Sequence, residues 1–373
     1  MKIYKNTCLH ILPMNKLSGA EKMVLLACKN MKEFTPIVVC GGEDLKKIFE
    51  KNGIKSYAIN FYNRNILNNL NGLKKIIKEN NIKILHAHDN KASINAYLVK
   101  RLYRLDVKVI SHIHSCYPFL KRNGINKKID SFFRQRYDFN IVCGNLVYDF
   151  YKENANYFNS DKIEIVSNAI DINEIINFNL SKSESARKEF NIPFNKTILG
   201  FVGRLCDIKG LIPFLEEFSN YKEEFNDCRV LLVGSGEQED EIKELIKKLK
   251  LQDLVILTGF QDDVYKFYPI IDIFFLSSFY EGLPMVLLEA MAFKKAIVSM
   301  NVGSVNEVIK NNETGILINE ANFKDLIKAL KEIKKEKYYI KKLGESAFEC
   351  VYRDFEINSY VMKIENIYNS IFN

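Results

Sequence analysis

The stretch from Phe274 to Val298 reads FFLSSFYEGLPMVLLEAMAFKKAIV and decides the expected fold of the chain. An apolar run at Ile273–Leu276 predicts a buried strand. Pro284 suits the first position of a helix, because its φ is already fixed near the helical value. A second apolar run at Ala296–Met300 predicts another strand. A strand, a helix and a second strand in this order are typical of a parallel α/β unit.

The loop before this helix has the features of a site for an anionic ligand. Gly282 lets the backbone approach a ligand closely, and the free N–H groups at the helix start attract negative charge. Glu281 lies in the loop, and Glu289 lies about one to two turns into the helix, where it could meet the far end of the ligand. Either Glu alone would be interpreted as an ordinary helix-start or surface acid.

The same alternation of strands and helices runs through most of the chain and restarts once. Residues 1–178 and 179–354 each predict a doubly wound parallel sheet, and the polar stretch at 179–195 predicts a linker with a short helix. The expected fold class is therefore α/β, with two Rossmann-like domains that face each other across a ligand cleft. Residues 355–373 predict a C-terminal helix, for which packing on the N-terminal domain is one option.

Three loops of the second half carry further motifs. Arg204 and Lys209 follow the expected strand Ile198–Val202 within the motif G-R-L-C-D-I-K-G. Arg can fork onto phosphate oxygens, and Lys adds a compact positive charge. The next two expected strands are followed by Val233-Gly234-Ser235-Gly236 and by Thr258-Gly259-Phe260. Basic residues in a loop are usually only solvated. The interpretation of Arg204 and Lys209 as phosphate-binding residues therefore depends on the motifs around them.

Together these motifs resemble those of a known enzyme family. E-x7-E, G-R-L-x3-K-G, V-G-x-G and T-G-F are similar to the signatures of retaining nucleotide-sugar glycosyltransferases of GT-B architecture. This is glycosyltransferase family 4, also called the group 1 transferases. The turn Val302-Gly303-Ser304-x-x-Glu307 matches the family's G-G-x-x-E imperfectly, and Lys294 and Lys295 replace the Gly that usually follows the helix.

The resemblance implies roles for the matched residues. Arg204 and Lys209 would neutralise the leaving diphosphate, Glu289 would hold ribose hydroxyls, and Glu281 would lie against the donor sugar. The other expected donor contacts are Ser18, Gly19, Gly234, Gly259, Phe260, Gly282, Leu283, Pro284 and Met285. Preorganised cations and a helix N-terminus stabilise charge that develops on a leaving diphosphate. Because these groups would do what a divalent ion does elsewhere, we expect neither a metal nor a cofactor.

The first half contributes histidines. All five His of the chain lie within residues 1–114. A lone His at a strand end is more often structural, but His114 resembles the family position whose His reaches the transferred sugar, with His112 as the fallback. His86 and His88 resemble the family's H-x-H turn, which mostly shapes the cleft. Ser18-Gly19 resembles the start of the family's G-G-A-E loop, with Ser in place of the first Gly, which would make this loop stiffer.

Composition and charge suggest where the protein works. Hydrophobic residues make up 47% of the 373 residues, and no apolar run reaches the roughly 18 residues of a membrane span. Eight Cys without a C-x-x-C pair predict reduced thiols in a cytoplasmic protein. Residues 1–180 carry a net charge of +12 and the rest −4, and residues 100–136 alone supply +8.

The basic stretch Lys100–Arg136 has two interpretations. Charge runs are usually a solvated face. Here, however, apolar residues interleave with the charges, namely Tyr117, Pro118, Phe119, Leu120, Ile125, Ile129, Phe132 and Phe133. An apolar and basic surface suits an anionic membrane, and no recognised nucleic-acid motif is present. We therefore expect peripheral association with the inner face of the cell membrane.

The sequence thus predicts a retaining glycosyltransferase. It would move a hexose or N-acetylhexosamine from a nucleotide diphosphate sugar, in our expectation UDP-linked, to a hydroxyl of a lipid-linked or surface glycan in polysaccharide biosynthesis. Front-face attack assisted by the leaving diphosphate is the mechanism that the family implies. The alternatives are a GT-B nucleotide-sugar epimerase or hydrolase, and a non-catalytic nucleotide-sugar-binding subunit.

Overall fold

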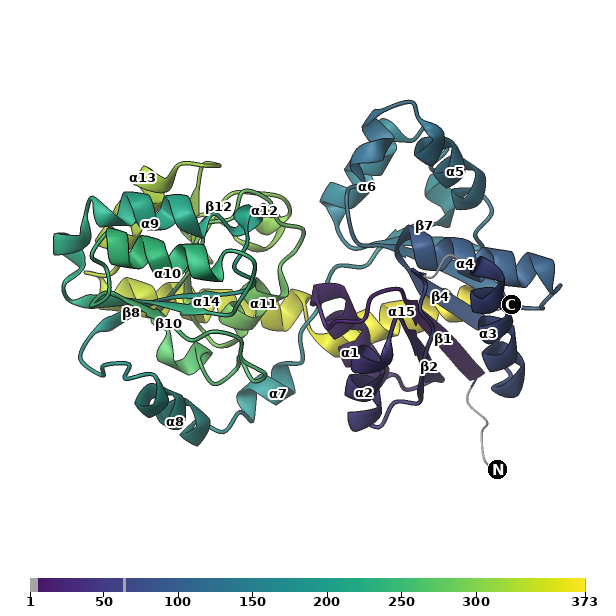
Figure 1. Cartoon of the computed structure of the whole chain (residues 1–373), viewed down its shortest axis with the longest axis horizontal. Coiled ribbons are helices and arrows are strands. Elements are labelled where there is room, and N and C mark those ends of the chain that lie inside the picture. Colours follow the sequence, from purple (N-terminus) through teal and green to yellow (C-terminus); the bar gives the residue numbers. More distant parts are fainter. Residues whose placement is uncertain (1–5, 63–64, 373) are drawn as a thin grey trace. The chain divides into compact units, whose positions relative to one another are not determined.

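The computed structural model describes residues 6–62 and 65–372 of the chain. The chain folds into two compact units (Figure 1). The N-terminal unit comprises Met1–Ala169 and Ile357–Asn373, and the C-terminal unit comprises Ile170–Glu356. Each unit contains one parallel sheet, so the expected pair of doubly wound α/β domains is confirmed.

The N-terminal unit is built on seven strands. They are β1 (Asn6–Leu12), β2 (Phe34–Cys40), β3 (Ser56–Ala58), β4 (Ile84–His88), β5 (Lys108–Ile113), β6 (Phe139–Val142) and β7 (Ile163–Ile165). Their order is β3-β2-β1-β4-β5-β6-β7, with every pair parallel. The helices are α1 (Gly19–Asn30), α2 (Glu43–Lys51), α3 (Ile66–Glu79), α4 (Asp89–Leu102), α5 (Ile125–Arg134), α6 (Asn145–Asn154) and α15 (Ile357–Phe372).

Successive side chains of a strand point to opposite faces of the N-terminal sheet, and each face has its own part of the core. Leu9 and Ile11 of β1 pack with buried residues of α3 and α4. Leu12, at the alternate position, packs with buried residues of α1 and α2 on the other face. This alternation of side-chain direction with every residue lets one strand contribute to the core on both faces of the sheet.

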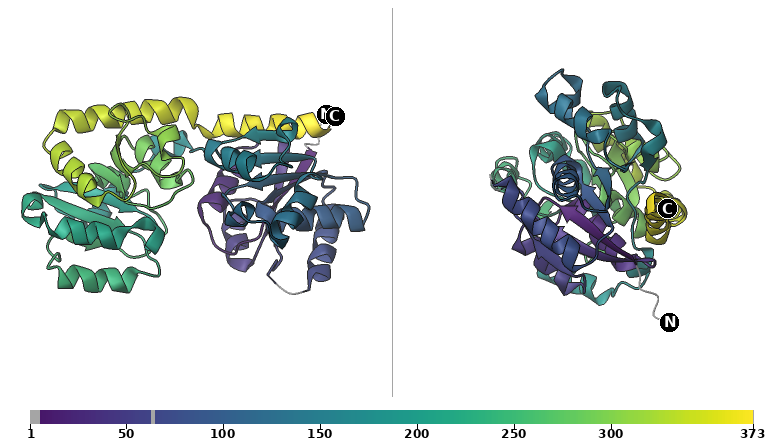
Figure 2. Two further views of the ribbon diagram at one scale, coloured as in Figure 1. Left: turned by 90° about the horizontal axis from the view of Figure 1, so that it is seen from above. Right: turned by 90° about the vertical axis from the view of Figure 1, so that its right-hand side faces the viewer.

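Helix α15 belongs to the N-terminal unit and runs along it (Figure 2). It packs against α1. One oxygen of the buried Glu365 accepts the backbone N–H groups of Lys32, Glu33 and Phe34, at 2.9, 2.7 and 3.3 Å. The last helix of the chain is therefore tied to the loop that leads into β2.

The C-terminal unit is built on six strands. They are β8 (Thr197–Val202), β9 (Cys228–Val233), β10 (Val255–Leu257), β11 (Ile273–Leu276), β12 (Ala296–Met300) and β13 (Ile316–Ile318), in the order β10-β9-β8-β11-β12-β13. The helices are α7 (Ile172–Ile176), α8 (Ser181–Glu189), α9 (Leu211–Ser219), α10 (Glu239–Lys248), α11 (Met285–Ala292), α12 (Val305–Val308), α13 (Phe323–Ile333) and α14 (Lys337–Asp354).

Two local details differ from the sequence expectation. Pro284 is the cap of α11 and has an extended backbone with ψ 127°, so the helix begins at Met285. The sequence places the domain boundaries after residues 178 and 354, whereas the contacts divide the chain after Ala169 and Glu356. The chain enters and leaves the C-terminal unit side by side, because the N–H of Ile170 donates to the carbonyl of Phe355 at 2.8 Å.

Candidate active site

Each sheet has one switch point, where the strand order reverses. The switch lies between β1 and β4 in the N-terminal unit and between β8 and β11 in the C-terminal unit. Open α/β sheets bind ligands at this point, beyond the carboxyl ends of the strands. The loops after β8 and β11 carry Arg204, Lys209 and Glu281, and the loop after β1 carries Ser18. These four sequence-predicted residues therefore lie in loops where the topology favours a ligand.

A partly buried ion pair joins the two loops at the switch point of the C-terminal unit. The Nζ of Lys209 lies 2.6 Å from the Oε1 of Glu281, and the hydroxyl of Ser278 donates to the same oxygen at 2.6 Å. The side chains of Lys209 and Glu281 are 19% and 8% exposed. A charge-assisted bond in such a place is stronger than one on an open surface. Lys209 and Glu281, which are 72 residues apart, thus form one unit of the site.

Glycine packing fixes the Glu281 loop. Gly303 has φ 57°, and a Cβ there would overlap the backbone carbonyl of Glu281, with the carbonyl carbon only 2.7 Å away. The next N–H, of Ser304, donates to the carbonyl of Gly282 at 3.2 Å. A Cβ on Gly282 itself would meet nothing within 4 Å. The loop is therefore held from one side by Gly303, while Gly282 faces open space.

The glycine-containing loops after β8 and β9 pack closely against each other beside Arg204. The N–H of Leu205 donates to the carbonyl of Ser235 at 2.9 Å. A Cβ on Gly234 or Gly236 would lie within 3.0 Å of the backbone of the neighbouring loop, at Gly203 and Leu205 respectively. The glycines of the V-G-x-G motif thus permit close packing of the loops after β8 and β9.

Arg204 itself points outward. Its side chain is 68% exposed and forms an ion pair with Glu237, which is 59% exposed. A surface ion pair of this kind contributes roughly 1 kcal/mol or less, so the guanidinium can exchange this partner for a phosphate at little cost. Gly259 closes the neighbouring loop with φ 67°, and the ring of Phe260 beside it is 71% exposed.

Glu289 is buried inside α11. It is 1% exposed, and the hydroxyl of Tyr268 donates to its Oε2 at 2.6 Å. Burial, with the Glu289 charge as a further cause, raises the pKa of Tyr268 well above its usual value, so this hydroxyl keeps its proton. The sequence did not reveal Tyr268 as a partner, because the two residues are 21 positions apart on different elements. Leu283 and Met285, at the start of the helix, are also buried.

Lys294 takes the left-handed backbone conformation at the position after α11 where a glycine was expected. It has φ 57°, the left-handed conformation that a Gly after α11 would adopt without strain. Lys295 beside it is largely buried, and this burial lowers its pKa to about 8.

In the N-terminal unit, Ser18 and Gly19 stand at the start of α1. Ser18 caps the helix: its N–H and its hydroxyl both reach the carboxylate of Glu21. Ser18 and Gly19 are exposed, whereas Glu21 is buried.

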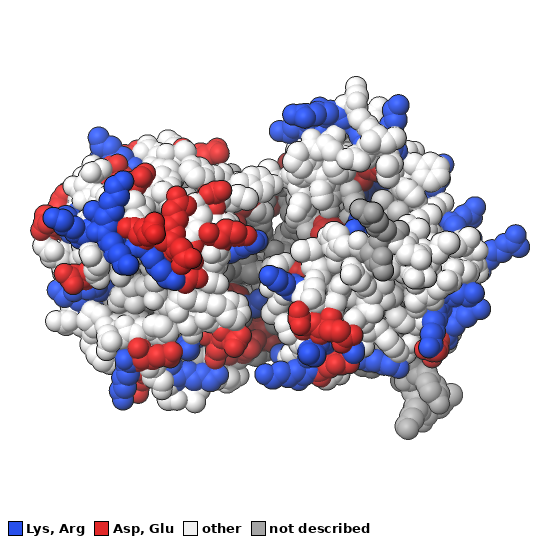
Figure 3. All heavy atoms as spheres, in the orientation of Figure 1, with Lys and Arg blue, Asp and Glu red and all other residues white. Residues whose placement is uncertain are grey.

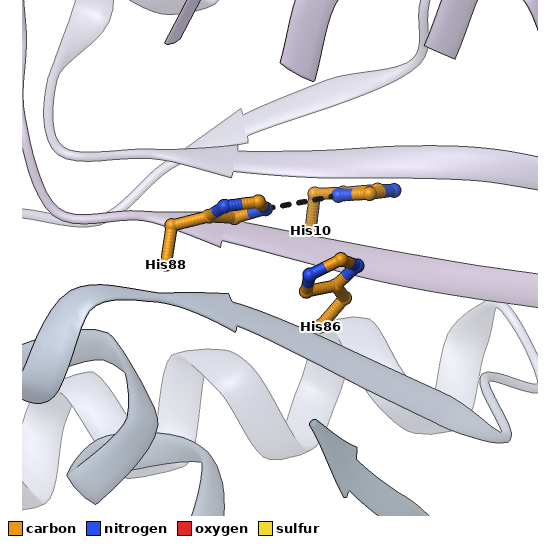
Figure 4. Close-up of side chains that lie close together, drawn as sticks. All are labelled: His10, His86 and His88. Atoms are coloured by element: carbon orange, nitrogen blue, oxygen red, sulfur yellow. Dashed lines mark hydrogen bonds between the residues drawn. The ribbon is translucent and has the colours of Figure 1, made fainter. Parts of the chain in front are cut away.

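The five histidines lie together on one face of the N-terminal sheet. His10 comes from β1, and His86 and His88 come from β4 (Figure 4). His112 comes from β5, and His114 directly follows β5. The nitrogens of two groups lie within 4.8 Å of one another, a spacing that could hold a metal ion: His10, His86 and His88, and His88, His112 and His114. Hydrogen bonds among the same nitrogens also explain this closeness.

These rings are neutral. Burial lowers the pKa of His10 to about 3 and depresses the pKa of each of the other four. His114 is partly exposed, and the other four are almost fully buried. The nearby carboxylates of Asp89 and Glu21 act on His114 in the opposite direction from burial.

The basic stretch Lys100–Arg136 does not form one continuous surface. Arg134 is 2% exposed and forms an ion pair with the buried Asp130 at 2.7 Å. Its guanidinium also donates to Ser111 at 2.7 Å, and Lys100 pairs with Asp138 at 2.7 Å. Leu120 is buried in the core, and the partly buried Tyr117, Phe119 and Phe133 pack against it or against the neighbouring core cluster. The stretch is therefore divided between side chains that pack within the unit and others that stay exposed.

The exposed residues of the stretch include Arg101 and Arg104 and, as a group, one side of α5 with the turn before it. The exposed apolar residues are Ile125, Ile129 and Phe132, and the exposed basic residues include Lys121, Arg122, Lys128 and Arg136. Basic atoms gather over the end of the N-terminal unit that carries α5 and α6 (Figure 3). We call Lys121–Arg136 the α5 surface.

Two Rossmann-like units with these loops define the GT-B class of glycosyltransferases. Residues 17–174 match the family model described as Glycosyltransferase Family 4, and residues 182–349 match Glycosyl transferases group 1. The chain therefore belongs to this glycosyltransferase family.

Two relatives match most of the chain. The N-acetyl-alpha-D-glucosaminyl L-malate synthase of Bacillus anthracis is 26% identical over 80% of this chain and 77% of its own length. The UDP-Gal:alpha-D-GlcNAc-diphosphoundecaprenol alpha-1,3-galactosyltransferase of Escherichia coli is 22% identical over 96% of this chain and 95% of its own. A glycosyltransferase structure from Rickettsia africae is 25% identical, with a TM-score of 0.86 and 99% of both chains covered. Among the helices described in this chain, none has the length and apolar character of a membrane span.

Proposed function

We propose that the protein transfers a hexose or N-acetylhexosamine, with retention, from a UDP-sugar to a hydroxyl of a lipid-linked glycan in polysaccharide biosynthesis. The observation that carries the proposal is the Lys209–Glu281 pair at the switch point of the C-terminal unit. The named relatives support the donor and the acceptor: one uses UDP-Gal, and its acceptor carries a diphosphoundecaprenol.

In the proposed mechanism, Lys209 and Arg204 stabilise the leaving diphosphate. The bond between C1 of the sugar and the diphosphate oxygen breaks, and the diphosphate takes the electron pair. Lys209 and the exposed Arg204 then stabilise the new negative charge, together with the N-terminus of α11. The attacking hydroxyl gives its proton to the departing diphosphate and bonds to C1 on the same face, which retains the configuration. These groups take the place of a divalent ion.

The carboxylates and His114 position the donor in this proposal. Glu281 lies against the sugar, and its bond to Lys209 holds it next to the diphosphate. Glu289, anchored by Tyr268, holds the ribose. His114 hydrogen-bonds to the transferred sugar. The remaining donor contacts are the backbone and side chains of Ser18, Gly19, Gly234, Gly259, Phe260, Gly282, Leu283, Pro284 and Met285.

A panel of UDP-sugars tests the function directly. A donor present at about 100 times its dissociation constant should raise the free energy of unfolding by roughly 2.7 kcal/mol. With that donor and a lipid-linked acceptor analogue, we expect UDP release matched by a glycoside that keeps the anomeric configuration of the donor in its NMR spectrum. Inversion would contradict the proposed mechanism. Free sugar as the main product, despite the acceptor, would make the protein a hydrolase.

The α5 surface supports peripheral binding to an anionic membrane. A depression of about 650 Å³ beside α5 is lined by Lys127, Lys128, Arg136 and Phe132 among others. Each basic residue near an anionic membrane contributes about 1 kcal/mol, and the exposed apolar residues can enter the headgroup layer.

Vesicle sedimentation tests this surface. We expect salt-sensitive binding of the full chain to vesicles that contain anionic phospholipid, and weaker binding when Lys121, Arg122, Lys127 and Lys128 are changed to Gln. Changing Lys243, Lys328, Lys335 and Lys341 of the C-terminal unit to Gln removes the same charge elsewhere and should leave binding unchanged. Equal loss in both variants would show a net-charge effect in place of a specific surface.

A further inference from the structure

Asp89 stands at the switch point of the N-terminal unit in an unusual backbone conformation. It directly follows β4 and begins α4, both labelled in Figure 1, and its φ is 66°. Among the described residues, it is the only non-glycine residue with a positive φ that directly follows a strand. Such a conformation costs free energy that a glycine at the same place would not lose. An aspartate here therefore indicates a use for its carboxylate.

Most other non-glycine residues with a positive φ end a helix. Five of them stand one position after the C-cap of a helix, where the left-handed conformation is common: Asn81, Arg104, Asn191, Lys250 and Lys294. The turn at Asp89 instead joins a strand to a helix. A sharp turn of this kind presents its side chain at the carboxyl end of the strand, which is where open α/β sheets bind ligands.

Neighbouring side chains hold this turn and its carboxylate in place. The hydroxyl of Tyr117 donates to the Oδ1 of Asp89. Burial, with the Asp89 charge as a further cause, raises the pKa of Tyr117 well above its usual value, so the phenol keeps its proton. At the next residue, the buried guanidinium of Arg134 donates to the Oδ1 of Asn90. The turn is thus fixed from the segment after β5 and from α5.

The carboxylate of Asp89 lies near His114, the residue that the proposed function places on the transferred sugar. The ring of His114 lies 2.9 Å from the ring of His88, which directly precedes Asp89. The Asp89 charge acts to raise the pKa of His114, against the effect of burial. Glu21, the other carboxylate that acts on His114, is only 3% exposed and already receives the hydrogen bond of the Ser18 N–H.

Asp89 keeps one carboxylate oxygen available for a ligand. The residue is partly exposed, and its Oδ2 receives no hydrogen bond from any residue that the structure describes. A carboxylate accepts hydrogen bonds and repels phosphate groups, so the hydroxyl groups of an uncharged sugar suit it. The diphosphate of the donor, which the proposed function assigns to the cations of the C-terminal unit, does not.

We propose that Asp89 binds a hydroxyl of the acceptor sugar and thereby selects an acceptor that carries no phosphate at this position. The role of the acceptor rests on the proposed function, but the binding of a sugar at Asp89 can be measured without transfer. Asp89 orients the acceptor and takes no proton, because the attacking hydroxyl gives its proton to the departing diphosphate. A hydroxyl of the donor sugar offers the same chemistry, so the experiment separates the two sources.

Saturation-transfer NMR of the full chain with UDP tests the binding step. The probes are methyl α-glucoside, methyl α-galactoside and methyl N-acetyl-α-glucosaminide. We expect the wild type to bind at least one of them, and Asp89→Gly to bind it roughly tenfold to more than a hundredfold more weakly, because a hydrogen bond to a charged group is lost. Glycine adopts a φ of 66° without strain, so the turn should survive. Asp149→Asn removes an exposed carboxylate of α6 and should bind like the wild type.

Kinetics separate the acceptor from the donor. In the transfer assay, Asp89→Gly should raise the KM for the acceptor by the same factor. Its KM for the UDP-sugar, and the slow hydrolysis of that donor in the absence of acceptor, should stay as in the wild type. A merely structural role of Asp89 would instead change stability, donor turnover and acceptor turnover together.

Several results would overturn the proposal. Equal affinity of the wild type and Asp89→Gly for the glycosides would do so, and so would a wild type that binds none of the three. A raised KM for the donor alone would assign Asp89 to the donor sugar. If Asp89→Gly fails to fold, the wild type still decides: glucose 6-phosphate that binds as tightly as methyl α-glucoside would contradict the proposed selection. A wild type that binds a glycoside through Asp89 but transfers no sugar would refute the proposed function alone.

Discussion

Gly303→Ala tests whether the Glu281 loop depends on glycine packing. Gly303 has φ 57°, and a Cβ would lie 2.7 Å from the carbonyl carbon of Glu281, where real Cβ atoms stay beyond 3.0 Å. The left-handed conformation of a non-Gly residue costs about 1–2 kcal/mol. Overpacking in a tight site adds roughly 1–3 kcal/mol. We therefore expect the unfolding free energy of the C-terminal unit to fall by roughly 2–5 kcal/mol.

The same substitution should also impair turnover. Relief of the overlap moves the backbone of Glu281 by on the order of 1 Å, and a misplacement of that size can cost about 10²-fold in rate. Urea unfolding is best followed by circular dichroism, because the chain contains no Trp. Turnover of the donor is measured on the same samples.

Two glycines serve as controls for Gly303→Ala. Gly259 has φ 67° in the same unit, and a Cβ there would have its nearest neighbour at 4.0 Å, so Gly259→Ala isolates the backbone strain in the unfolding measurement. Gly53 in the N-terminal unit has φ 75° and nothing within 4 Å, so Gly53→Ala should leave turnover unchanged. If Gly303→Ala were no less stable than Gly259→Ala and as active as Gly53→Ala, the packing argument would be refuted.

Three further outcomes are expected. Asp130→Asn leaves the buried guanidinium of Arg134 without its counter-charge and should destabilise the N-terminal unit by roughly 3–5 kcal/mol; an effect below 1 kcal/mol in urea unfolding would contradict the buried pair. The pKa of His10 is lowered in the folded protein, so below about pH 6.5 the unfolded form takes up a proton that the folded form does not. The free energy of unfolding should therefore fall by about 2 kcal/mol from this group between pH 7 and pH 5. A flat pH profile that is the same in His10→Gln would rule this out. Glu289→Gln should weaken the binding of free UDP, and Glu281→Gln should weaken mainly the binding of the intact UDP-sugar; equal losses of both ligands in calorimetry would remove the distinction.

Local patterns in the sequence predict most of the fold. The strands Ile273–Leu276 and Ala296–Met300 have the expected bounds, because each is a short apolar run between polar turns. The start of α11 differs by one residue, since Pro284 also suits the extended backbone of a cap. The division into units depends on contacts between distant residues, such as Ile170 with Phe355, which local patterns do not show.

The candidate site also has features that local sequence patterns predict and features that depend on contacts between distant residues. The charged residues after β8 and β11 follow from motif and position, but the pairing of Lys209 with Glu281 depends on the strand order. Convergence of the five histidines depends on the register and on α15. The buried Arg134 was hidden in a run of basic residues, although its spacing of four from Asp130 on a helix was a signal that could have found the pair.

Calorimetric titration of UDP into the wild type and Lys209→Ala tests most directly whether the switch point of the C-terminal unit is the donor site. Lysine removal deletes a charge-assisted bond, worth about 1.5–3 kcal/mol, so the affinity for UDP should fall by roughly tenfold to more than a hundredfold. Lys243→Ala in the same unit removes a lysine of similar charge that pairs with Glu239, and it should bind UDP like the wild type. One UDP per chain, with the loss confined to Lys209→Ala, is the predicted result. Equal UDP affinity in all three proteins, or no UDP binding by the wild type, would contradict the assignment.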